Sequence, residues 1–445
     1  MLLLLVFSRL ERNGTSNVST RRGFLRQAIG FVAAMSGLGA SSCDGHKVAA
    51  PCPATRPNCG IVAIRGGVVA GGIHSLWETV RETPGDQGSW STMAPVSTNL
   101  LPPGFWTLID LDIAAVPRGS PSGCEESHVV LIPASGPSRG VFPGEVFYKR
   151  QLIDGTWTMG FETLSTGLGG GAFVIARPWR FGRISLARVN DELHACGITA
   201  NYGSSTMDTG ILAHTVRHFD TTLDAGGFER NQFSAWEDVA GLAGTSGTFV
   251  DVGCAGVRNP DTNSDELHVC AVSDDGRLWH SVRFGSTSWT HLTDVAAQAG
   301  SNGPFSRVDC AADGNLLHVV AVGQDGGLWY TIRGVNGWRA FEDVRNAPAH
   351  MFPFPSPGHV YDVAIGLWNN GLPAGQWQLI VVAMAFEGAT FYTIRSSQPV
   401  AWQNPPGTNQ SPTPWKPWTD LVAETAYTEG GGFTSATVAT RPLLP

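Results

Sequence analysis

Short runs of apolar or alternating residues, separated by turn-forming residues, fill most of the chain, and residues 317–344 show this pattern most clearly. They read "LHVVAVGQDGGLWYTIRGVNGWRAFEDV", with an apolar run, a turn at residues 325–327 and an alternating run that ends at Arg333. A second turn at residues 336–337 precedes a third run. Asp-Gly and Asn-Gly adopt the left-handed conformations that tight hairpins need, so the stretch predicts three antiparallel strands.

The same pattern recurs along the chain. Residues 267–295 read "LHVCAVSDDGRLWHSVRFGSTSWTHLTDV" and match residues 317–344 position by position. Weaker copies begin near residues 75, 127, 193 and 379. A further apolar run precedes each copy after the first, so the unit is four short strands over roughly 50 to 75 residues. Four-stranded units repeated in this way are typical of a β-propeller.

The two ends of the repeat region predict how such a ring closes. The first unit begins near Gly60 and lacks a first strand, whereas residues 431–440 read as a first strand with nothing after it. Pairing the two segments removes two open sheet edges. The expected fold is an all-β propeller over residues 60–445, with about six four-stranded blades and the C-terminal strand in the N-terminal blade. A short, degenerate seventh blade within residues 44–75 is the alternative.

Residues 1–42 have the features of a twin-arginine export signal. Arg21 and Arg22 precede a moderately apolar stretch, residues 28–38, which is too short for a membrane-spanning helix. The alternative is a chance arginine pair ahead of a buried helix. We expect an exported protein, either a periplasmic or cell-surface lipoprotein or a secreted protein.

A cysteine follows the signal among small residues. The sequence "ASSC" ending at Cys43 is similar to a lipobox, although an alanine stands where a large apolar residue is usual. Lipid attached at Cys43 would anchor the protein stably, and ordinary cleavage with soluble release is the alternative. Residues 43–59 are polar and Pro-rich, which predicts a tether. Within it, Cys52 and Cys59 can close a small loop in an oxidising compartment.

Charge and composition narrow the function classes. The formal net charge is −8 and the sequence pI is near 5.8, so there is no electrostatic basis for binding nucleic acid or an anionic membrane surface. Only 15% of residues are charged and Gly is frequent, which is typical of a turn-rich β protein and not of a disordered or coiled-coil chain. Membrane contact is therefore expected only through the N-terminal lipid.

The third strand of each unit carries the candidate binding residues. Alternation places Trp329, Thr331 and Arg333 on one face, where the indole can stack on a sugar ring and the guanidinium can donate hydrogen bonds to its hydroxyls. The equivalent aromatic–Arg pairs elsewhere are Trp77 and Arg81, Trp279 and Arg283, and Phe391 and Arg395. The alternative is that these side chains pack blade against blade, with each Arg paired to an acidic residue of a segment such as "FEDV".

Four histidines occupy the same position in different units, namely His128, His194, His268 and His318. Equivalent positions in a ring do not converge on one ion unless they line its axis, and no close His-x-His or Cys-x-x-Cys spacing is present. We therefore expect no metal and no other cofactor. Each histidine is expected to hydrogen-bond within its own blade.

Cys254 and Cys270 fall on adjacent antiparallel strands. Counting back from the turn near residue 262 places them opposite each other, and export would permit a disulfide. Cys310, however, occupies the position equivalent to Cys254 and is expected to face Val320, so this slot accepts small apolar side chains. Buried free thiols are the favoured interpretation.

The copies "DDGRLWHSVR" and "DGGLWYTIR", each followed by a Trp, resemble the PLL-type bacterial β-propeller lectins. The resemblance covers about residues 60–445 and is sharpest in the fourth and fifth units. It implies binding of fucose and related, sometimes O-methylated, sugars in pockets between blades. Those lectins have seven blades, so the expected six depart from the family, although fucose lectins with six blades also exist.

Two other functions compete with carbohydrate binding. A propeller glycosidase such as a sialidase needs paired carboxylates or an activated Tyr at a single axial site, plus a cluster of Arg. The sequence shows no lone acidic constellation of that kind, and "SDDGRLW" is only loosely similar to the sialidase aspartate box. The other alternative is a non-catalytic platform that docks a cell-envelope protein. We expect a binding protein, not an enzyme, because repeated equivalent surfaces suit multivalent recognition of clustered glycans.

Overall fold

The computed structural model describes residues 62–440, apart from gaps in the connections between strands, of which the longest are 165–178, 219–232 and 401–412. Residue contacts divide the chain into one unit of Met1–Asp44 with Gly71–Ile73 and a second unit of Gly45–Ala70 with His74–Pro445. Everything below concerns the second unit. The predicted signal segment, the lipid-bearing Cys43, the tether and the Cys52–Cys59 loop all lie outside the described residues.

The described strands form six antiparallel sheets, which we call blades and number along the chain. From the inside outwards, the first blade contains β27 (Phe433–Thr440), β1 (Val62–Ala70), β2 (Ile73–Arg81) and β3 (Ala94–Pro95). The second contains β4 (Thr107–Pro117), β5 (Glu125–Ser135), β6 (Phe147–Gln151) and β7 (Glu162–Thr163). The third contains β8 (Phe181–Val189), β9 (Glu192–Thr199), β10 (Leu212–His218) and β11 (Glu237–Asp238).

The fourth to sixth blades each have a fifth short strand, because the outermost segment pairs twice with the third strand. The fourth contains β12 (Phe249–Asn259), β13 (Ser264–Ser273), β14 (Leu278–Phe284), β15 (Ser288–Trp289) and β16 (Thr293–Asp294). The fifth contains β17 (Phe305–Asp313), β18 (Leu316–Gly323), β19 (Leu328–Gly334), β20 (Gly337–Trp338) and β21 (Glu342–Asp343). The sixth contains β22 (Val360–Trp368), β23 (Gln378–Ala385), β24 (Thr390–Val400), β25 (Thr413–Trp415) and β26 (Thr419–Asp420).

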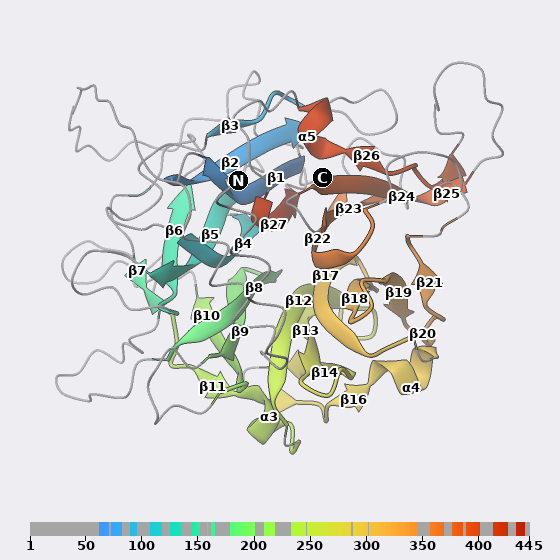
Figure 1. Cartoon of the computed structure of the whole chain (residues 1–445). Helices are drawn as coiled ribbons and strands as arrows, with labels where there is room; N and C mark the ends of the chain where they lie inside the picture. Colours follow the sequence, from blue (N-terminus) through green and yellow to red (C-terminus); the bar gives the residue numbers. More distant parts are fainter. Residues whose placement is uncertain are drawn as a thin grey trace, which may run out of the picture. The chain divides into compact units, whose positions relative to one another are not determined.

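The blades are arranged radially, with their first strands around a common axis (Figure 1). These innermost strands contact one another in the order β4, β8, β12, β17, β22 and β27, and β27 contacts β4. The predicted all-β propeller is therefore confirmed. The C-terminal strand also lies where the sequence placed it, since β27 pairs antiparallel with β1 from Val62 opposite Thr440 to Val68 opposite Phe433. β1 falls within residues 44–75, the region considered for a seventh blade, and belongs to the first blade.

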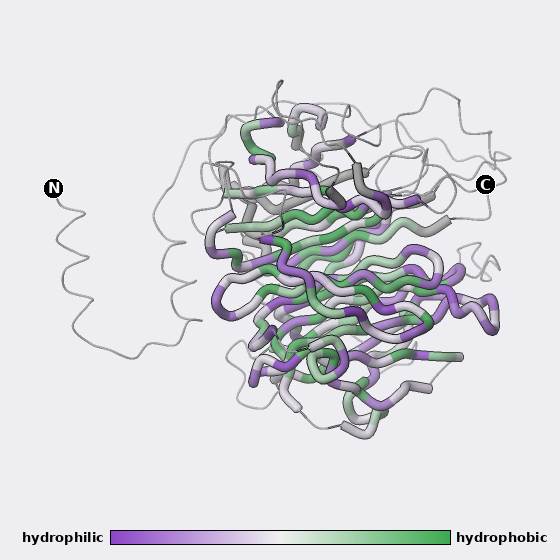
Figure 2. Tube along the Cα trace, turned by 90° about the vertical axis from the view of Figure 1, so that its right-hand side faces the viewer, coloured by the Kyte–Doolittle hydropathy of each residue, from purple (hydrophilic) through white to green (hydrophobic). Residues whose placement is uncertain are grey.

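Hydrophobic residues run along the strands and hydrophilic residues gather at the turns (Figure 2), and clusters of buried apolar side chains join neighbouring blades. The second strands are the most deeply buried, and every residue of β23 is buried. One cluster joins the third strand of the fifth blade to the sixth blade, and another joins the sixth blade to the first. Burial of each large aliphatic side chain contributes about 1.5–3 kcal/mol, so the stacked faces supply most of the stability of the ring.

In the third, fourth and sixth blades, the aspartate of the "EDV", "TDV" or "TDL" segment caps a short helix. Asp238 accepts a hydrogen bond from Gly241 N (3.0 Å) at the start of α3 (Val239–Leu242). Asp294 does the same for α4 (Val295–Ala299), and Asp420 for α5 (Leu421–Glu424). Aspartate is a favoured helix N-cap, so the repeated residue has a local structural role.

The register of the fourth blade corrects the prediction for its cysteines. Cys254 pairs with Val269 and Cys270 pairs with Gly253, so the two cysteines are not opposite each other. The turn closes between Asn259 and Ser264, which shifts the register by one residue from the one expected. A shift of one residue sends side chains to the other face of a sheet.

The fifth blade departs from its predicted register in the same way, since Cys310 pairs with Val319 and not with Val320. All four described cysteines are buried and carry free thiols.

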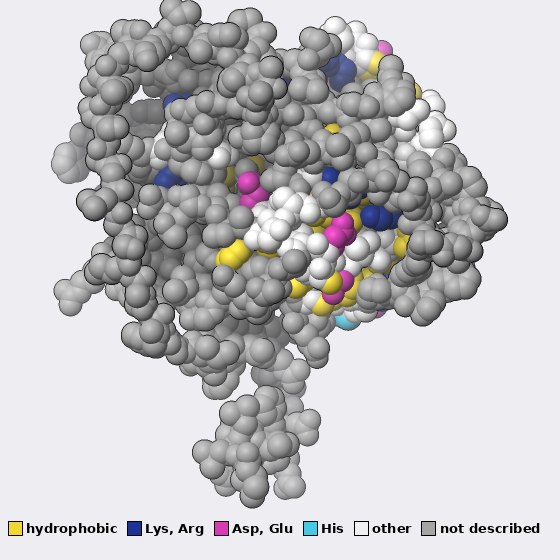
Figure 3. All heavy atoms as spheres, turned by 90° about the horizontal axis from the view of Figure 1, so that it is seen from above, with side chains coloured by type: hydrophobic (Ala, Val, Ile, Leu, Met, Phe, Trp, Pro, Cys, Tyr) yellow, Lys and Arg dark blue, Asp and Glu magenta, His cyan; other side chains and the backbone are white. Residues whose placement is uncertain are grey.

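On the face seen in Figure 3, acidic and basic side chains lie interspersed with apolar ones in the part that the structure describes. Such mixed charge is consistent with the modest net charge of the chain. Within the described ranges, no helix has the length and apolar content required to cross a bilayer.

Candidate functional site

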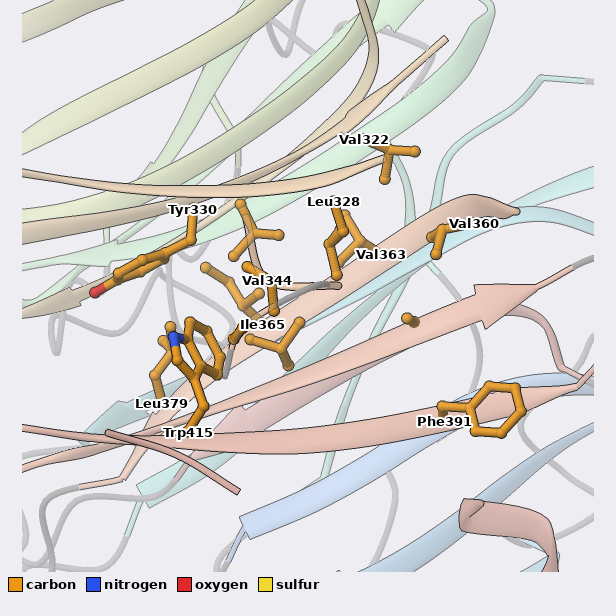
Figure 4. Packing of buried hydrophobic residues seen from close by; sticks show 14 of the residues in the cluster. Val322, Leu328, Tyr330, Val344, Val360, Val363, Ile365, Leu379, Phe391 and Trp415 are labelled. Carbon is orange, nitrogen blue, oxygen red and sulfur yellow. The ribbon is translucent and has the colours of Figure 1, made fainter. Parts of the chain in front are cut away.

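The aromatic–Arg face of each third strand lies against the preceding blade, and the interface between the fifth and sixth blades shows what it contacts. Arg395 of β24 forms an ion pair with Glu342 of β21, with 3.3 Å between Nη2 and Oε2. Trp415 Nε1 donates to Oε1 of the same carboxylate (2.6 Å). The Arg395 guanidinium also lies 4.8 Å from the ring centre of Tyr330, and Tyr330 and Trp415 extend into the same space between the sheets (Figure 4).

The interface between the third and fourth blades repeats this arrangement. Glu237 accepts a hydrogen bond from Trp289 Nε1 (3.2 Å) and lies 3.7 Å from Arg283 Nε. His214 stands where Tyr330 stands in the fifth blade, and its Nδ1 is 2.8 Å from Glu237 Oε1. Arg283 and Trp289 are both buried. Their side chains therefore hold the two blades together.

The interface between the second and third blades has the same elements, although the sequence there is less regular. Arg217 Nη1 donates to Glu162 Oε2 (2.7 Å). Its guanidinium lies 4.5 Å from the ring centre of Tyr148 and 5.3 Å from that of Phe233. In three interfaces, then, an Arg of one blade is neutralised by a Glu of the preceding blade. Packing between blades, the alternative considered for these Arg residues, describes all three.

The interface between the fourth and fifth blades breaks the rule. On the outer strand of the fourth blade, Thr293 pairs with His280. The equivalent residue is Glu342, paired with Tyr330, in the fifth blade and Glu237, paired with His214, in the third. A threonine therefore occupies the position of the carboxylate. Arg333 of the fifth blade faces this position. The backbone of Arg333 pairs with Leu317 and Trp338, but in the described part of the chain its side chain has no hydrogen bond or ion pair.

The interface between the fourth and fifth blades is also more exposed to solvent than the interfaces that contain Trp289 and Trp415. Trp338, the cross-strand partner of Arg333, is partly exposed, whereas its equivalents Trp289 and Trp415 are only 9% and 1% exposed. Arg333 is likewise partly exposed. An unpaired guanidinium and an accessible indole therefore stand side by side, which is the combination that a sugar hydroxyl and a sugar face can use.

Two neutral imidazoles of the fourth blade lie close to Arg333 and Trp338. His268 Nδ1 and His280 Nε2 are 3.1 Å apart, and the His280 ring meets Trp338 edge to face at 5.2 Å between ring centres. Burial, followed by the positive charge of Arg333, lowers the pKa of His268 to about 3. Burial, His268 and Arg333 together lower the pKa of His280 well below its usual value. Both rings are buried and uncharged at neutral pH, so they add no positive charge beside Arg333.

The first and sixth blades meet through a buried Arg. Arg81 is fully buried, 5.8 Å from the ring centre of Trp90, and Trp90 packs edge to face on Tyr392. Tyr392 donates through its hydroxyl to Glu424 of α5 (2.6 Å). A ligand would reach Arg81 only after these groups moved.

The predicted aromatic–Arg pairs are not close neighbours along their strands. Trp329 and Arg333 are four residues apart on one face, which separates them by about 13 Å, and the same holds for Trp77, Trp279 and Phe391 relative to their Arg residues. Trp279 Nε1 instead donates to Ser273 Oγ near the hairpin turn (2.9 Å). The aromatic partner of Arg333 is Trp338, which sequence reasoning missed. The Asn-Gly turn at residues 336–337 was the available signal, since it fixes this cross-strand pair.

The repeated histidines bond within their own blades, as predicted from the sequence. Nδ1 of His128 is 2.6 Å from the hydroxyl of Tyr148, and that of His318 is 2.8 Å from the hydroxyl of Tyr330. His194 and His214 are 2.9 Å apart in the same way. Across the described ranges, no group of three or more His, Cys, Asp and Glu side chains is placed to hold a metal ion.

A second candidate site is a cavity of about 570 Å³ at one end of the propeller axis. Asp112, Ser185 and Asp309 line it, and Arg188 and Arg258 lie towards the strand ends. Its carboxylates are engaged with the neighbouring blade: Asp112 accepts from Leu186 N (2.5 Å) and Asp309 accepts from Ile365 N (2.8 Å). Innermost strands share no ladder of backbone hydrogen bonds, so these side chains join one blade to the next.

A buried layer of charge lies beside this cavity. Arg183 is 3.3 Å from Asp251 and 3.5 Å from both Asp110 and Asp362. Burial raises the pKa of Asp110 to about 7 despite the attraction of Arg183. Asp110 also accepts a hydrogen bond from Ile184 N (2.9 Å). The layer therefore links the blades at the axis, and Asp110 titrates near neutral pH.

Comparison with known proteins gives structural likenesses only. No protein-family model matches the chain, and no curated protein matches it. AofleA from Arthrobotrys oligospora has 13% identity and a TM-score of 0.40 over 87% of this chain and 92% of its own. A fungal lectin from Aleuria aurantia, described as a six-bladed β-propeller with a novel fucose recognition mode, has 13% identity and a TM-score of 0.40 over 79% and 98%. Trypanosoma rangeli sialidase has 10% identity and a TM-score of 0.43 over 72% and 51%. Because lectins and an enzyme are found at the same low similarity, the likenesses carry no conclusion about function.

Proposed function

We propose that this protein is a non-catalytic, carbohydrate-binding propeller of six blades, and that its best-formed binding site is the pocket between the fourth and fifth blades. The observation that carries the proposal is the break in the interface pattern at Thr293. In three other interfaces a Glu neutralises the facing Arg. Between the sixth and first blades Thr419 takes the Glu position, but the facing Arg81 is fully buried. Only partly buried, Arg333 and Trp338 remain available here.

The chemistry of the pocket suits a neutral sugar. A guanidinium donates up to five hydrogen bonds and accepts none, so it pairs well with ring and hydroxyl oxygens. An indole stacks on the apolar face of a pyranose, and a deoxy or O-methylated sugar offers a larger apolar face. Fucose-like and O-methylated sugars are therefore the ligand class that we propose. The similarity of the repeats to PLL-type lectins leads to the same class.

A glycan array tests the identity of the ligand. The wild-type protein is expected to bind fucosylated or O-methylated glycans. Trp338→Ala is expected to lose most of the signal, because the sugar can no longer stack on the indole while the buried core of the blade is kept. A blank array from well-folded protein would refute carbohydrate binding.

One observation favours a second candidate, a docking platform for a cell-envelope protein. Phe284 and Val335 are 45% and 75% exposed, and both lie on hairpins that join the third strand to the outer strand in adjacent blades. Exposed apolar side chains on neighbouring hairpins are a feature of protein-contact surfaces. A folded protein that ignores glycans but loses a partner after Phe284→Ser would favour this alternative.

We further propose export through the twin-arginine segment and lipid attachment at Cys43. The propeller would then display its pocket at the cell envelope, held by the tether of residues 43–59. Both proposals rest on the sequence pattern of the N-terminal residues.

A further inference from the structure

The four described cysteines lie at two successive interfaces and form two inter-blade pairs. Cys196 on β9 belongs to the third blade and Cys254 on β12 to the fourth. Cys270 on β13 belongs to the fourth blade and Cys310 on β17 to the fifth. β9 packs against β12, and β13 packs against β17. Each pair therefore spans a junction between blades.

Hydrogen bonds and register orient the first pair. Ser185 is the cross-strand partner of Cys196, so both side chains lie on the same face of the third blade. Ser185 Oγ accepts from Cys254 N (3.1 Å) and is 3.4 Å from Cys254 Sγ. That face is thus directed at Cys254, and Cys196 and Cys254 belong to the same buried cluster between the two blades.

Close backbone approach orients the second pair. Gly253 is the cross-strand partner of Cys270. A Cβ atom on Gly253 would lie 2.8 Å from Asp309 Cα and 3.0 Å from Cys310 N, so this face of the fourth blade abuts β17 directly. Cys270 points from the same face, and Cys270 and Cys310 belong to the same buried cluster between the two blades.

Equivalent positions at other interfaces carry aliphatic side chains. Between the second and third blades, Asp112 stands at the position of Ser185, and Val130 and Leu186 stand at the positions of Cys196 and Cys254. Between the fifth and sixth blades, Asp309 stands at the position of Ser185, and Val320 and Ile365 stand at the two cysteine positions. A small or medium apolar side chain is therefore sufficient for packing here. Cysteine at both members of two successive pairs adds a chemical capability that packing does not require.

We propose that Cys196–Cys254 and Cys270–Cys310 are the sites of two disulfides that tie the third blade to the fourth and the fourth to the fifth. Each disulfide forms by exchange with a donor disulfide, such as that of oxidised glutathione or of an oxidised dithiol oxidoreductase. In this exchange the two cysteine thiols lose two protons and two electrons. One S–S bond forms in the protein, and the disulfide of the donor is reduced to two thiols. Because all four sulfurs are buried, exchange takes place during folding, before the interfaces close.

Peptide mapping tests the pairing, because trypsin separates the four cysteines. Cleavage at arginines places them in different peptides, which end at Arg217, Arg258, Arg277 and Arg333. The full-length protein is denatured, reduced, refolded with a mixture of reduced and oxidised glutathione, alkylated under denaturing conditions and digested without reduction. The expected products are the Arg217 peptide linked to the Arg258 peptide, and the Arg277 peptide linked to the Arg333 peptide. If refolding fails, the same peptide map is made from protein that was produced in an oxidising compartment.

Two outcomes would overturn the proposal: a folded protein in which all four cysteines are alkylated, or a linked pair of the Arg258 and Arg277 peptides, which joins Cys254 to Cys270. Cys196→Val provides the matched control. The second blade already has a valine, Val130, at the position equivalent to Cys196, so the variant is expected to fold. Cys254 is then alkylated, while Cys270 and Cys310 remain linked.

Discussion

At the scale of single residues, one position distinguishes the proposed site from the three interfaces that an Arg–Glu pair closes. Glu162, Glu237 and Glu342 each accept the Arg of the next blade, and Thr293 does not. An ion pair that is only partly buried adds little to stability, whereas an unpaired guanidinium gains from any ligand that supplies acceptors. In the proposed site, the absence of this one carboxylate leaves the Arg333 side chain free to bind a ligand.

Thr293→Glu should close the pocket. The new carboxylate stands opposite Arg333, as Glu342 stands opposite Arg395, so binding to glycans should be lost while the free energy of unfolding stays within about 1 kcal/mol of wild type. Urea unfolding and the glycan array measure the two properties on the same sample. Thr293→Ser, which introduces no charge, serves as the control, and retained binding in Thr293→Glu would argue against Arg333 as a ligand contact.

The axial carboxylates predict a pH dependence of stability. The pKa of Asp110 is raised from 3.8 to about 7, so the folded state binds this proton more tightly than the unfolded chain. The stability contributed by the bound proton is present below about pH 4 and is lost as the pH rises towards 7. In Asp110→Asn the free energy of unfolding should fall less steeply over this window, by at most about 1.4 kcal/mol per pH unit.

Urea denaturation at several pH values between 4 and 7 isolates this effect as the difference between wild type and Asp110→Asn. The exposed Asp274→Asn is the matched control and should leave the slope unchanged. A wild-type-minus-variant difference that is the same at every pH would contradict the assignment.

At the scale of elements, each interface depends on groups from strands of two blades. Glu342 on β21 receives both Arg395 on β24 and Trp415 on β25. The Trp415 indole is 1% exposed, so its N–H cannot turn to water if the carboxylate is removed. A buried donor that loses its partner costs about 1–3 kcal/mol.

Glu342→Ala should therefore lower the free energy of unfolding by about 2 kcal/mol. Glu342→Gln keeps an acceptor for Trp415 and should cost clearly less. Urea unfolding of the two variants beside wild type provides the comparison, and equal losses in both would mean that the hydrogen bond from Trp415 contributes nothing measurable.

Sequence patterns predict the elements better than they predict the site. Repeated hairpin turns such as residues 325–327 place the strands, and alternation identifies the face that carries Arg333. The partner of each Arg comes from another blade, so it depends on how the blades stack, which a local pattern does not contain. Small errors in register also matter. The observed register differs by one residue from the predicted one, so Cys254 and Cys270 are not opposite each other, and each lies in a buried cluster with a cysteine of a different blade.

At the scale of the whole molecule, closure of the ring depends on the last strand. β27 supplies the innermost strand of the first blade, where Val438 and Ala436 are buried. Thr437 also donates to Asp112 of the second blade (2.6 Å). Residues from both ends of the propeller therefore complete one blade, and that blade contacts both of its neighbours.

Removal of residues 433–445 should abolish cooperative unfolding, because it exposes the edge of β1 and removes the contacts of β27 with β4 and β22. Thermal unfolding followed by circular dichroism measures the loss. Removal of residues 441–445 alone, which keeps β27 complete, is the control. A truncated protein that still melts in one sharp transition would show that closure by β27 is dispensable.

The N-terminal proposals predict a lipid on the exported protein. Metabolic labelling with a radioactive fatty acid should mark the wild-type protein, and Cys43→Ala should lose the label and appear in the soluble fraction. Cys52→Ala should keep the label. Labelled Cys43→Ala would place the lipid elsewhere, and unlabelled wild type would favour soluble release.

Calorimetric titration of the best sugar from the array into wild type, Arg333→Ala and Arg339→Ala tests carbohydrate binding between the fourth and fifth blades most directly. Arg339 is an exposed residue of the same hairpin and gives the same change in charge. Arg333→Ala should weaken binding by a factor of about 10 to 100, the range expected for losing hydrogen bonds to a charged donor, while Arg339→Ala binds like wild type. Equal affinity in all three proteins, or no heat of binding in wild type, would contradict the proposed site.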